Sequence, residues 1–370
     1  MLLEEWRLQS SVFGGRRFAF FPALVFVLSL GFSVAALRFS TLTGAALADG
    51  MNFLSVFLGL GAGAAALSSS DALENVLGPT NFLVYSSRTL PLSRRRLFAY
   101  FVISDLLYYT ALFLVPLGAG LAAAGGLEPR LLLMPVFFGA GAVVSSVFAV
   151  SSLRSPATPV SYGTTGRTIE DVSLVSLGRA AGGILKPVFS MGVIAGLFVG
   201  LTSYFPVAQV FLRNPSLSFS ALAGVTSLSV YNWLNRFDDP EDYAYLPVSR
   251  SQLVEAKQNA YLLVAGPLTL VFLLPFLAVS RPSSWILSLV TAASTITLTA
   301  GAASLITGLK PNSRLYDSAV FLKYLGLNSL FVVPLLALSV FYTPQLLVVV
   351  VGLSGVTAAA GVLAARRARQ

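Results

Sequence analysis

Ten long apolar runs divide this chain of 370 residues, and polar connections separate them. The runs have 18 to 27 residues, and about 17 to 25 residues is the length that an α-helix needs to cross the hydrocarbon core of a membrane. None of them alternates apolar and polar residues as the strands of an outer-membrane barrel do. The sequence therefore predicts an all-α, polytopic helical membrane protein with about ten transmembrane helices. The runs lie at about 18–37, 51–68, 98–124, 131–151, 185–205, 216–234, 258–279, 284–305, 319–341 and 344–365.

The composition agrees with this class of protein. Hydrophobic residues make up 56% of the chain and charged residues only 11%, whereas soluble proteins carry about 25% charged residues. The chain has no cysteine and no histidine. This excludes disulfides, thiol catalysis, Cys/His metal sites and histidine acid–base chemistry.

The basic residues are distributed very unevenly between the two sides of the predicted membrane. With the N-terminus in the cytoplasm, the outer connections hold only Arg38, Arg130, Arg213 and Arg281 of the 24 lysines and arginines. This is the positive-inside asymmetry of membrane proteins. We therefore interpret the net charge of +9 as a topology signal and expect no nucleic-acid partner. The expected location is the plasma membrane, as a multi-pass protein with both termini in the cytoplasm and membrane lipids around it.

The first 17 residues combine apolar and charged side chains. Leu2, Leu3 and Trp6 stand beside Glu4 and Arg7, just before the first apolar run. This pattern fits an interfacial helix that lies at the membrane surface. A flexible leader is the alternative.

A five-residue motif occurs twice, each time just before a long apolar run. It reads Leu90-Pro91-Leu92-Ser93-Arg94 in the first copy and Leu246-Pro247-Val248-Ser249-Arg250 in the second, an offset of 156 residues. The same offset aligns Leu97 with Leu253 and Arg154 with Lys310. We therefore predict an internal repeat of four spans. Because four is an even number, both copies would have the same orientation in the membrane.

These features divide the chain into five expected parts. The first is the interfacial N-terminal helix at 1–17, followed by a first transmembrane repeat at 18–155. A cytoplasmic connector at 156–184 leads to the second repeat at 185–315. Two C-terminal spans and a basic tail occupy 316–370.

The residue types of the motif predict its local structure. Proline is favoured in the first turn of a helix, because its missing N–H has no helical partner there. The serine that follows can accept hydrogen bonds from nearby backbone amides. Each copy is thus expected to be a short, rigid helix start at the cytoplasmic face. The alternative is an ordinary helix start combined with basic membrane anchors.

The first copy continues as Arg95-Arg96-Leu97, and this stretch resembles the coupling-helix motif of permease subunits of type-2 ABC transporters of the exporter class. The N-terminal interfacial helix and the order of spans are similar as well. The resemblance implies that both copies dock into grooves of cytoplasmic P-loop ATPase subunits, which would bind ATP and Mg. The docking residues would be Leu90, Pro91, Ser93, Arg94, Arg95, Arg96, Leu246, Pro247, Ser249 and Arg250.

The chain also departs from that family. Those permeases commonly have six spans and one motif, whereas about ten spans and two copies are found here. One chain could therefore serve as both halves of the transmembrane unit, or a second permease chain could complete it.

Motifs for catalysis are absent from the sequence. It has no Gly-x-x-x-x-Gly-Lys-[Ser/Thr] loop, no His-Glu-x-x-His and no Gly-x-Ser-x-Gly. We therefore expect that the chain is not an enzyme, carries no metal or cofactor, and relies on a partner for ATP hydrolysis. The acidic cluster at 238–242 is interpreted as a solvated turn or a charge partner for a basic surface, with a divalent-ion site as the alternative.

A few polar residues fall inside the predicted spans. Asp105 is the clearest ionisable one, and such residues often mark a transport pathway. A structural pairing with a basic residue on the cytoplasmic side is the other interpretation. Asn232, Asn235 and Asn328 are expected to form polar contacts between helices.

Together these features predict the membrane-spanning permease subunit of an ABC exporter. Two alternatives remain open. One is an ion-coupled secondary transporter, in which Asp105 would be essential. The other is a membrane scaffold or assembly subunit that transports nothing.

Overall fold

The computed structural model describes residues 19–39, 43–77, 103, 106–125, 128–154, 168–179, 183–205, 208–237, 243, 245–314 and 318–370. Within these ranges the regular elements are all helical and no strand occurs. This confirms the predicted all-α class.

Nine helices in the described part are long and apolar enough to cross a membrane. They match nine of the ten predicted spans. The tenth, predicted at 216–234, folds into α10 (Pro215–Phe237), whose 23 residues would extend about 34 Å. It falls short in hydropathy because Ser216, Ser218 and Ser220, all buried, replace apolar side chains.

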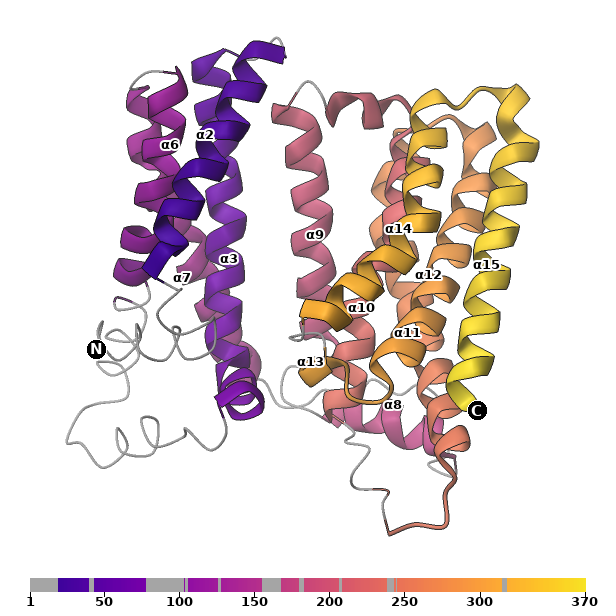
Figure 1. The fold of residues 1–370 in the computed structure, drawn as a ribbon. Helices are drawn as coiled ribbons and strands as arrows, with labels where there is room; N and C mark the ends of the chain where they lie inside the picture. Colours follow the sequence, from indigo (N-terminus) through magenta and orange to yellow (C-terminus); the bar gives the residue numbers. More distant parts are fainter. Residues whose placement is uncertain are drawn as a thin grey trace, which may run out of the picture. The chain divides into compact units, whose positions relative to one another are not determined.

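The chain forms two compact units, and each is considered by itself. Unit 1 comprises residues 1–151 and 199–209, and unit 2 comprises 152–198 and 210–370. Unit 1 contains the earlier helices of Figure 1, and α9 contributes its last residues to it. The elements of unit 1 are α2 (Phe21–Phe39), α3 (Gly44–Leu77), the π-helical turn η2 (Thr110–Leu114), α6 (Val115–Gly125), the 3₁₀ turn η3 (Pro129–Leu133) and α7 (Met134–Arg154).

The core of unit 1 is apolar and aromatic. Helix α2 packs along α6, and buried side chains of α3, α7 and the segment after α9 meet between the helices. The buried residues of this core are Leu47, Met51, Leu114, Leu121, Met134, Phe138 and Phe205.

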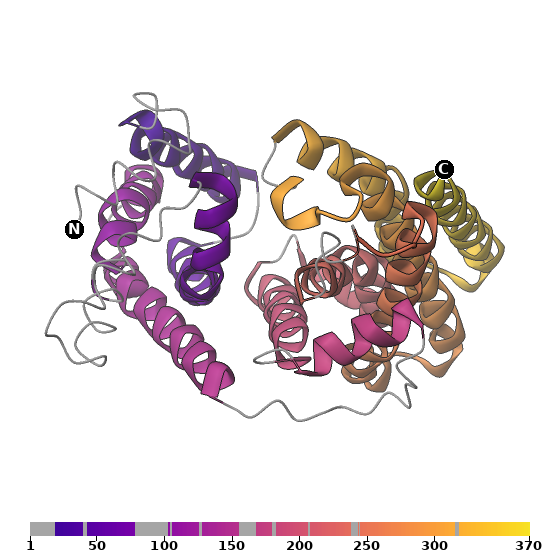
Figure 2. The same cartoon turned by 90° about the horizontal axis from the view of Figure 1, so that it is seen from below.

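Unit 2 is a larger bundle in which α10, α11 and α12 are the most deeply buried helices. The short amphipathic helix α8 packs against α10 and α11 and lies across one end of the bundle, as Figures 1 and 2 both show. Besides α10, the elements of unit 2 have the following bounds: α8 (Ile169–Arg179), α9 (Leu185–Tyr204), η4 (Ala208–Arg213), α11 (Arg250–Ala278), η6 (Pro282–Ser284), α12 (Trp285–Thr307), α13 (Pro311–Arg314), α14 (Ser318–Phe341), η7 (Pro344–Leu346) and α15 (Leu347–Arg369).

Close helix crossings in unit 2 depend on glycine. A methyl group added to Gly224 of α10 would overlap the backbone of Thr295 in α12. At the crossing of α12 and α15, a methyl group on Gly301 would overlap the carbonyl oxygen of Gly361. Small residues let the backbones of membrane helices approach one another, which maximises packing where lipid supplies no hydrophobic driving force.

Candidate docking site at the basic end of unit 2

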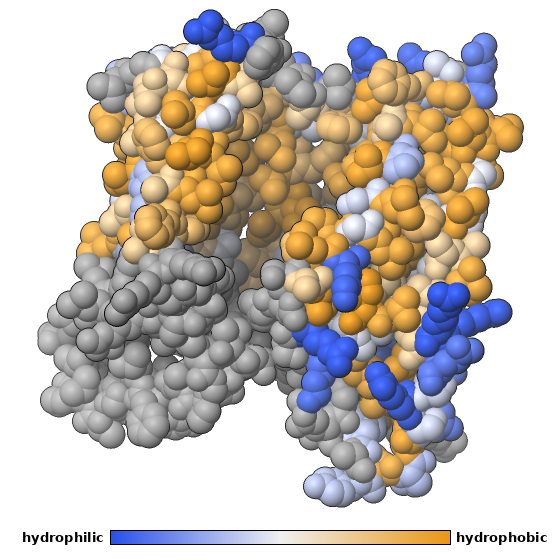
Figure 3. Space-filling model, in the orientation of Figure 1, coloured by the Kyte–Doolittle hydropathy of each residue, from blue (hydrophilic) through white to orange (hydrophobic). Residues whose placement is uncertain are grey.

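One end of unit 2 gathers exposed cationic side chains, and we call it the basic end. It is the end at which α8 lies, α11 begins and α15 finishes. Figure 3 shows hydrophobic side chains over the middle of the visible face of this unit and hydrophilic ones towards its ends. The opposite end carries Arg213 and Arg281. Among the side chains that the structure describes, the exposed cations of the basic end are Arg250, Lys310, Arg314, Lys323, Arg366 and Arg367.

The second motif copy projects from the basic end with its side chains accessible. Tyr245 is 96% exposed and Leu246 is 53% exposed. Pro247, Ser249 and Arg250 are exposed too. Two backbone hydrogen bonds shape the turn, from the amide of Leu246 to the oxygen of Tyr243 (3.1 Å) and from that of Val248 to the oxygen of Leu246 (2.7 Å). A side chain as large as Tyr245 fully in solvent is a candidate contact residue that the motif comparison missed.

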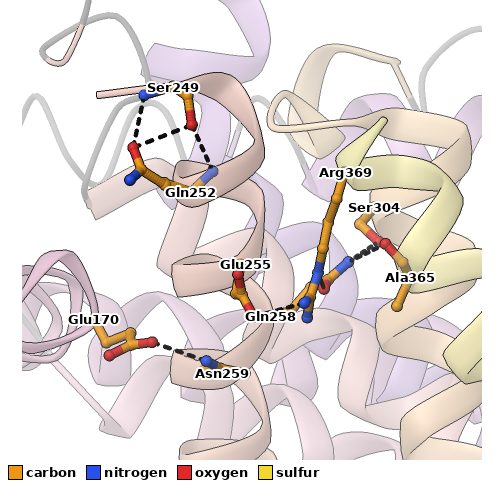
Figure 4. Close-up of polar contacts among 9 residues, drawn as sticks. All are labelled: Glu170, Ser249, Gln252, Glu255, Gln258, Asn259, Ser304, Ala365 and Arg369. Atoms are coloured by element: carbon orange, nitrogen blue, oxygen red, sulfur yellow. Dashed lines mark hydrogen bonds and ion pairs between the residues drawn. The ribbon is translucent and has the colours of Figure 1, made fainter. Parts of the chain in front are cut away.

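The helix start after this turn differs from the prediction in one respect. Helix α11 begins at Arg250 with Ser249 as its N-cap, so Pro247 stands two residues before the cap and not in the first turn. The helix starts at this position because Gln252, three residues after Ser249, forms a capping box with it (Figure 4). The Ser249 hydroxyl accepts from the amide of Gln252 (3.2 Å), and the Gln252 Oε1 accepts from the amide of Ser249 (3.0 Å). The capping role predicted for the serine is confirmed.

The second motif copy leads directly into a long helix. Helix α11 runs from Arg250 to Ala278, whereas the apolar run predicted a span only from 258. Two helical turns therefore extend the membrane helix to the motif. A displacement of the exposed turn would act directly on a helix that reaches across the membrane.

Two lysines near the basic end lie against aromatic rings. Lys257 is fully buried, and its Nζ lies 5.9 Å from the centre of the Tyr243 ring. The Nζ of Lys186 lies 4.8 Å from the centre of the Trp233 ring. The charge distribution in the sequence assigns both lysines to the cytoplasmic side of the predicted membrane. The structure gives them cation–π contacts within the bundle, which the charge pattern alone could not indicate.

The polar residues predicted inside spans have different partners. Asn328 accepts a hydrogen bond from Thr299 of α12 through its Oδ1 (3.4 Å), which confirms one interhelical contact. Asn235 instead donates to the oxygen of Tyr231 in its own helix (2.9 Å).

Several predicted features lie outside the described residues. They are the interfacial helix at 1–17, the acidic cluster at 238–242, Asp105, and the first-copy residues Leu90, Pro91, Ser93, Arg94, Arg95 and Arg96. Docking by these residues, and the internal repeat itself, stay predictions.

No family model, curated protein or solved structure matches the chain. Its class therefore follows from its own helices: it is an all-α, multi-pass membrane protein.

Proposed function

We propose that this chain is the permease subunit of an ABC-type exporter, driven by separate cytoplasmic P-loop ATPase subunits. The observation that carries the proposal is the exposed turn at 245–250, which stands at the basic end and continues directly into α11. By the positive-inside rule, this end would face the cytoplasm, where ATP is available.

The exposed side chains of the turn suit a protein partner. Tyrosine and arginine are over-represented among residues that dominate binding energy, because they combine large contact area with directed hydrogen bonds. Tyr245, Leu246 and Arg250 offer an aromatic ring, an aliphatic group and a guanidinium within six residues. A complementary partner would present an apolar groove with carboxylates at its rim. Arg94, Arg95 and Arg96 would make the equivalent contacts in the first copy.

The helices that follow the two motif copies each contain an irregularity, at positions that the offset of 156 residues aligns. In unit 1 it is the π-helical turn Thr110–Leu114. The offset of 156 residues maps this turn onto 266–270, and Pro267 lies there inside α11. Proline removes one hydrogen bond from the helix, and both irregularities are places where helices bend. Such bends support a mechanism in which movement of the docked turns tilts the outer halves of the helices and changes access to a substrate path.

The proposal is tested by reversing one charge at the basic end. A tagged chain is purified from its native membranes, and the associated P-loop ATPase and its ATP hydrolysis are measured. We expect Arg250→Glu to reduce the recovered ATPase about tenfold, the effect of losing about 1.4 kcal/mol of binding. Arg281→Glu is the matched control, since it makes the same charge change on an exposed residue of the opposite end.

Two outcomes would overturn the proposal. One is the absence of any P-loop ATPase from the wild-type preparation, and the other is an equal recovery with both variants. Transport in proteoliposomes that needs an ion gradient, needs no ATP and is lost in Asp105→Asn would instead identify a secondary transporter.

A further inference from the structure

A buried glutamine lies on α11 about 12 Å beyond Arg250, at 1.5 Å per residue. Gln258 is only 2% exposed, yet its amide group is well supplied with hydrogen-bond partners (Figure 4). Its Nε2 donates to the Ser304 hydroxyl of α12 (2.7 Å) and lies 3.4 Å from the Ala365 carbonyl oxygen of α15. Its Oε1 accepts from the Nε of Arg369 at the end of α15 (3.0 Å). One side chain therefore joins α11, α12 and α15 near the exposed turn at 245–250, which we call the docking turn.

Arg369 makes a second contact with the same face of α11. Its Nη1 donates to Glu255 Oε1 at 2.6 Å, while its Nε donates to Gln258. Glu255 and Gln258 are three residues apart, so their side chains are neighbours on the helix surface. The planar guanidinium fixes both donors in one rigid fork, which a lysine could not do.

The two helices on the other side of this contact form a tightly packed pair. Helix α12 packs along α15, and Gly301 and Gly361 bring their backbones together near Ser304. The Ser304 hydroxyl donates to its own helix at Ala300 O (2.8 Å), which leaves its oxygen free to accept from Gln258. Gln258 and Arg369 thus attach α11 to the α12–α15 pair as a whole.

Another side of α11 is bonded to helix α8. Asn259, the next residue, donates to Glu170 Oε1 of α8 at 2.8 Å (Figure 4). The stretch 255–259 is therefore held from two directions.

We propose that Gln258 and Arg369 are positioning residues for the docking turn. They couple the first turns of α11 to α12 and α15, so that a displacement of the turn moves these three helices together. This role rests on the proposed ATPase docking for its functional consequence. The contact itself can be measured without any partner.

The structural arm of the test uses the absence of cysteine from the chain, which allows site-specific spin labels without further changes. Labels at Ser251→Cys on α11 and Arg367→Cys on α15 report the distance between the two helix ends. We expect a narrow distance distribution that broadens with Arg369→Gln and, to a smaller extent, with Glu255→Gln. Arg366→Gln removes the same charge from an exposed neighbour and should leave the distribution unchanged.

The functional arm separates positioning from binding. Arg369→Gln should leave the amount of co-purified ATPase unchanged and reduce the ATP hydrolysis of that complex about tenfold, a common size for coupling between sites. Arg369→Lys should restore little of it, because lysine lacks the fork. Unchanged distances in both Arg369→Gln and Glu255→Gln would overturn the inference, as would ATP hydrolysis in the Arg369→Gln complex that equals that of the wild type. If the wild type brings no ATPase, the docking proposal fails while the distance measurement still decides whether the contact holds the helices.

Discussion

Unit 1 and unit 2 both consist of packed helices, but among the described residues only those of unit 2 form an inner layer of buried helices. In the span Pro282–Thr307 of unit 2, 72% of an 18-residue apolar stretch is buried within the protein. Among the described spans of unit 1, Gly44–Ala62 is the most buried, and the corresponding share is 39%. A helix surrounded by other helices meets side chains and not lipid, so its sequence is under different constraints.

The chemistry of the two interiors follows from this difference. Inner helices of unit 2 exchange hydroxyl hydrogen bonds with their neighbours, such as Ser218 with Ser339 (2.8 Å) and Thr291 with Ser354 (3.1 Å). Unit 1 has fewer such contacts among its described residues, for example the Ser33 hydroxyl of α2 donating to the oxygen of Leu121 in α6 (3.5 Å). Low hydropathy in a membrane helix can thus indicate a central position, as it does for α10.

The largest predicted effect concerns the feature that the two units share, close crossing at glycine. Gly301→Val in unit 2 and Gly141→Val in unit 1 would each push a side chain into the backbone of the facing helix. Overpacking of this kind costs about 1–3 kcal/mol or more. Both variants should therefore lower the midpoint of thermal unfolding of the detergent-solubilised protein clearly.

The controls for this prediction use glycines with open surroundings. Gly352→Val in unit 2 and Gly61→Val in unit 1 make the same substitution where an added Cβ meets nothing within 4 Å. They remove the same backbone freedom without the overlap. A control that unfolds as early as its partner would show that helix propensity, and not the crossing, is responsible.

A smaller effect is expected from a hydroxyl contact in the inner layer of unit 2. The Thr295 hydroxyl of α12 donates to Ser220 O of α10 (3.0 Å) and to Ala292 O of its own helix (3.1 Å), and it accepts from the Gly224 amide of α10 (3.2 Å). Thr295→Val keeps the shape and removes both contacts with α10, with an expected loss of about 0.6–1.7 kcal/mol. Thr297→Val is the control, since the Thr297 hydroxyl bonds to Ala293 in its own helix. Equal unfolding midpoints for the two variants would mean that hydroxyl bonds between helices do not stabilise the inner layer.

Much of this fold could be predicted from the sequence, because an apolar run in lipid must satisfy its own backbone hydrogen bonds and a helix does so locally. Even α10 was found, since its run at 216–234 still contains many apolar residues among the serines. The start of α11 was placed too late. Leu253, Val254 and Ala256 are buried in its first turns, but charged and polar neighbours interrupt the apolar run there.

The site was predictable only where it is local in sequence. The repeated motif located the turn at 246–250, and Ser249 was correctly expected to cap a helix. The contact of Gln258 with Arg369 joins residues 111 positions apart, and neither residue stands in a recognisable pattern. Such a contact depends on how α11 and α15 pack, which hydropathy does not encode. The exposure of Tyr245 depends likewise on the path of the turn.

The smallest predicted effect belongs to a polar contact of unit 1. Arg130, one of the four basic residues on the predicted outer side, donates to Asp49 Oδ2 at 2.6 Å, with about half of each side chain exposed at 51% and 42%. Exposed ion pairs contribute about 0–1 kcal/mol, and salt screens them. Asp49→Asn should therefore lower the unfolding midpoint slightly at low salt and leave it unchanged at high salt, whereas the deficit of Thr295→Val should persist in both. The comparison between the units would be contradicted if Asp49→Asn lowered the unfolding midpoint as much as Thr295→Val does, at low and at high salt alike. Unit 1 would then be stabilised by a polar contact as strong as those of the inner layer of unit 2.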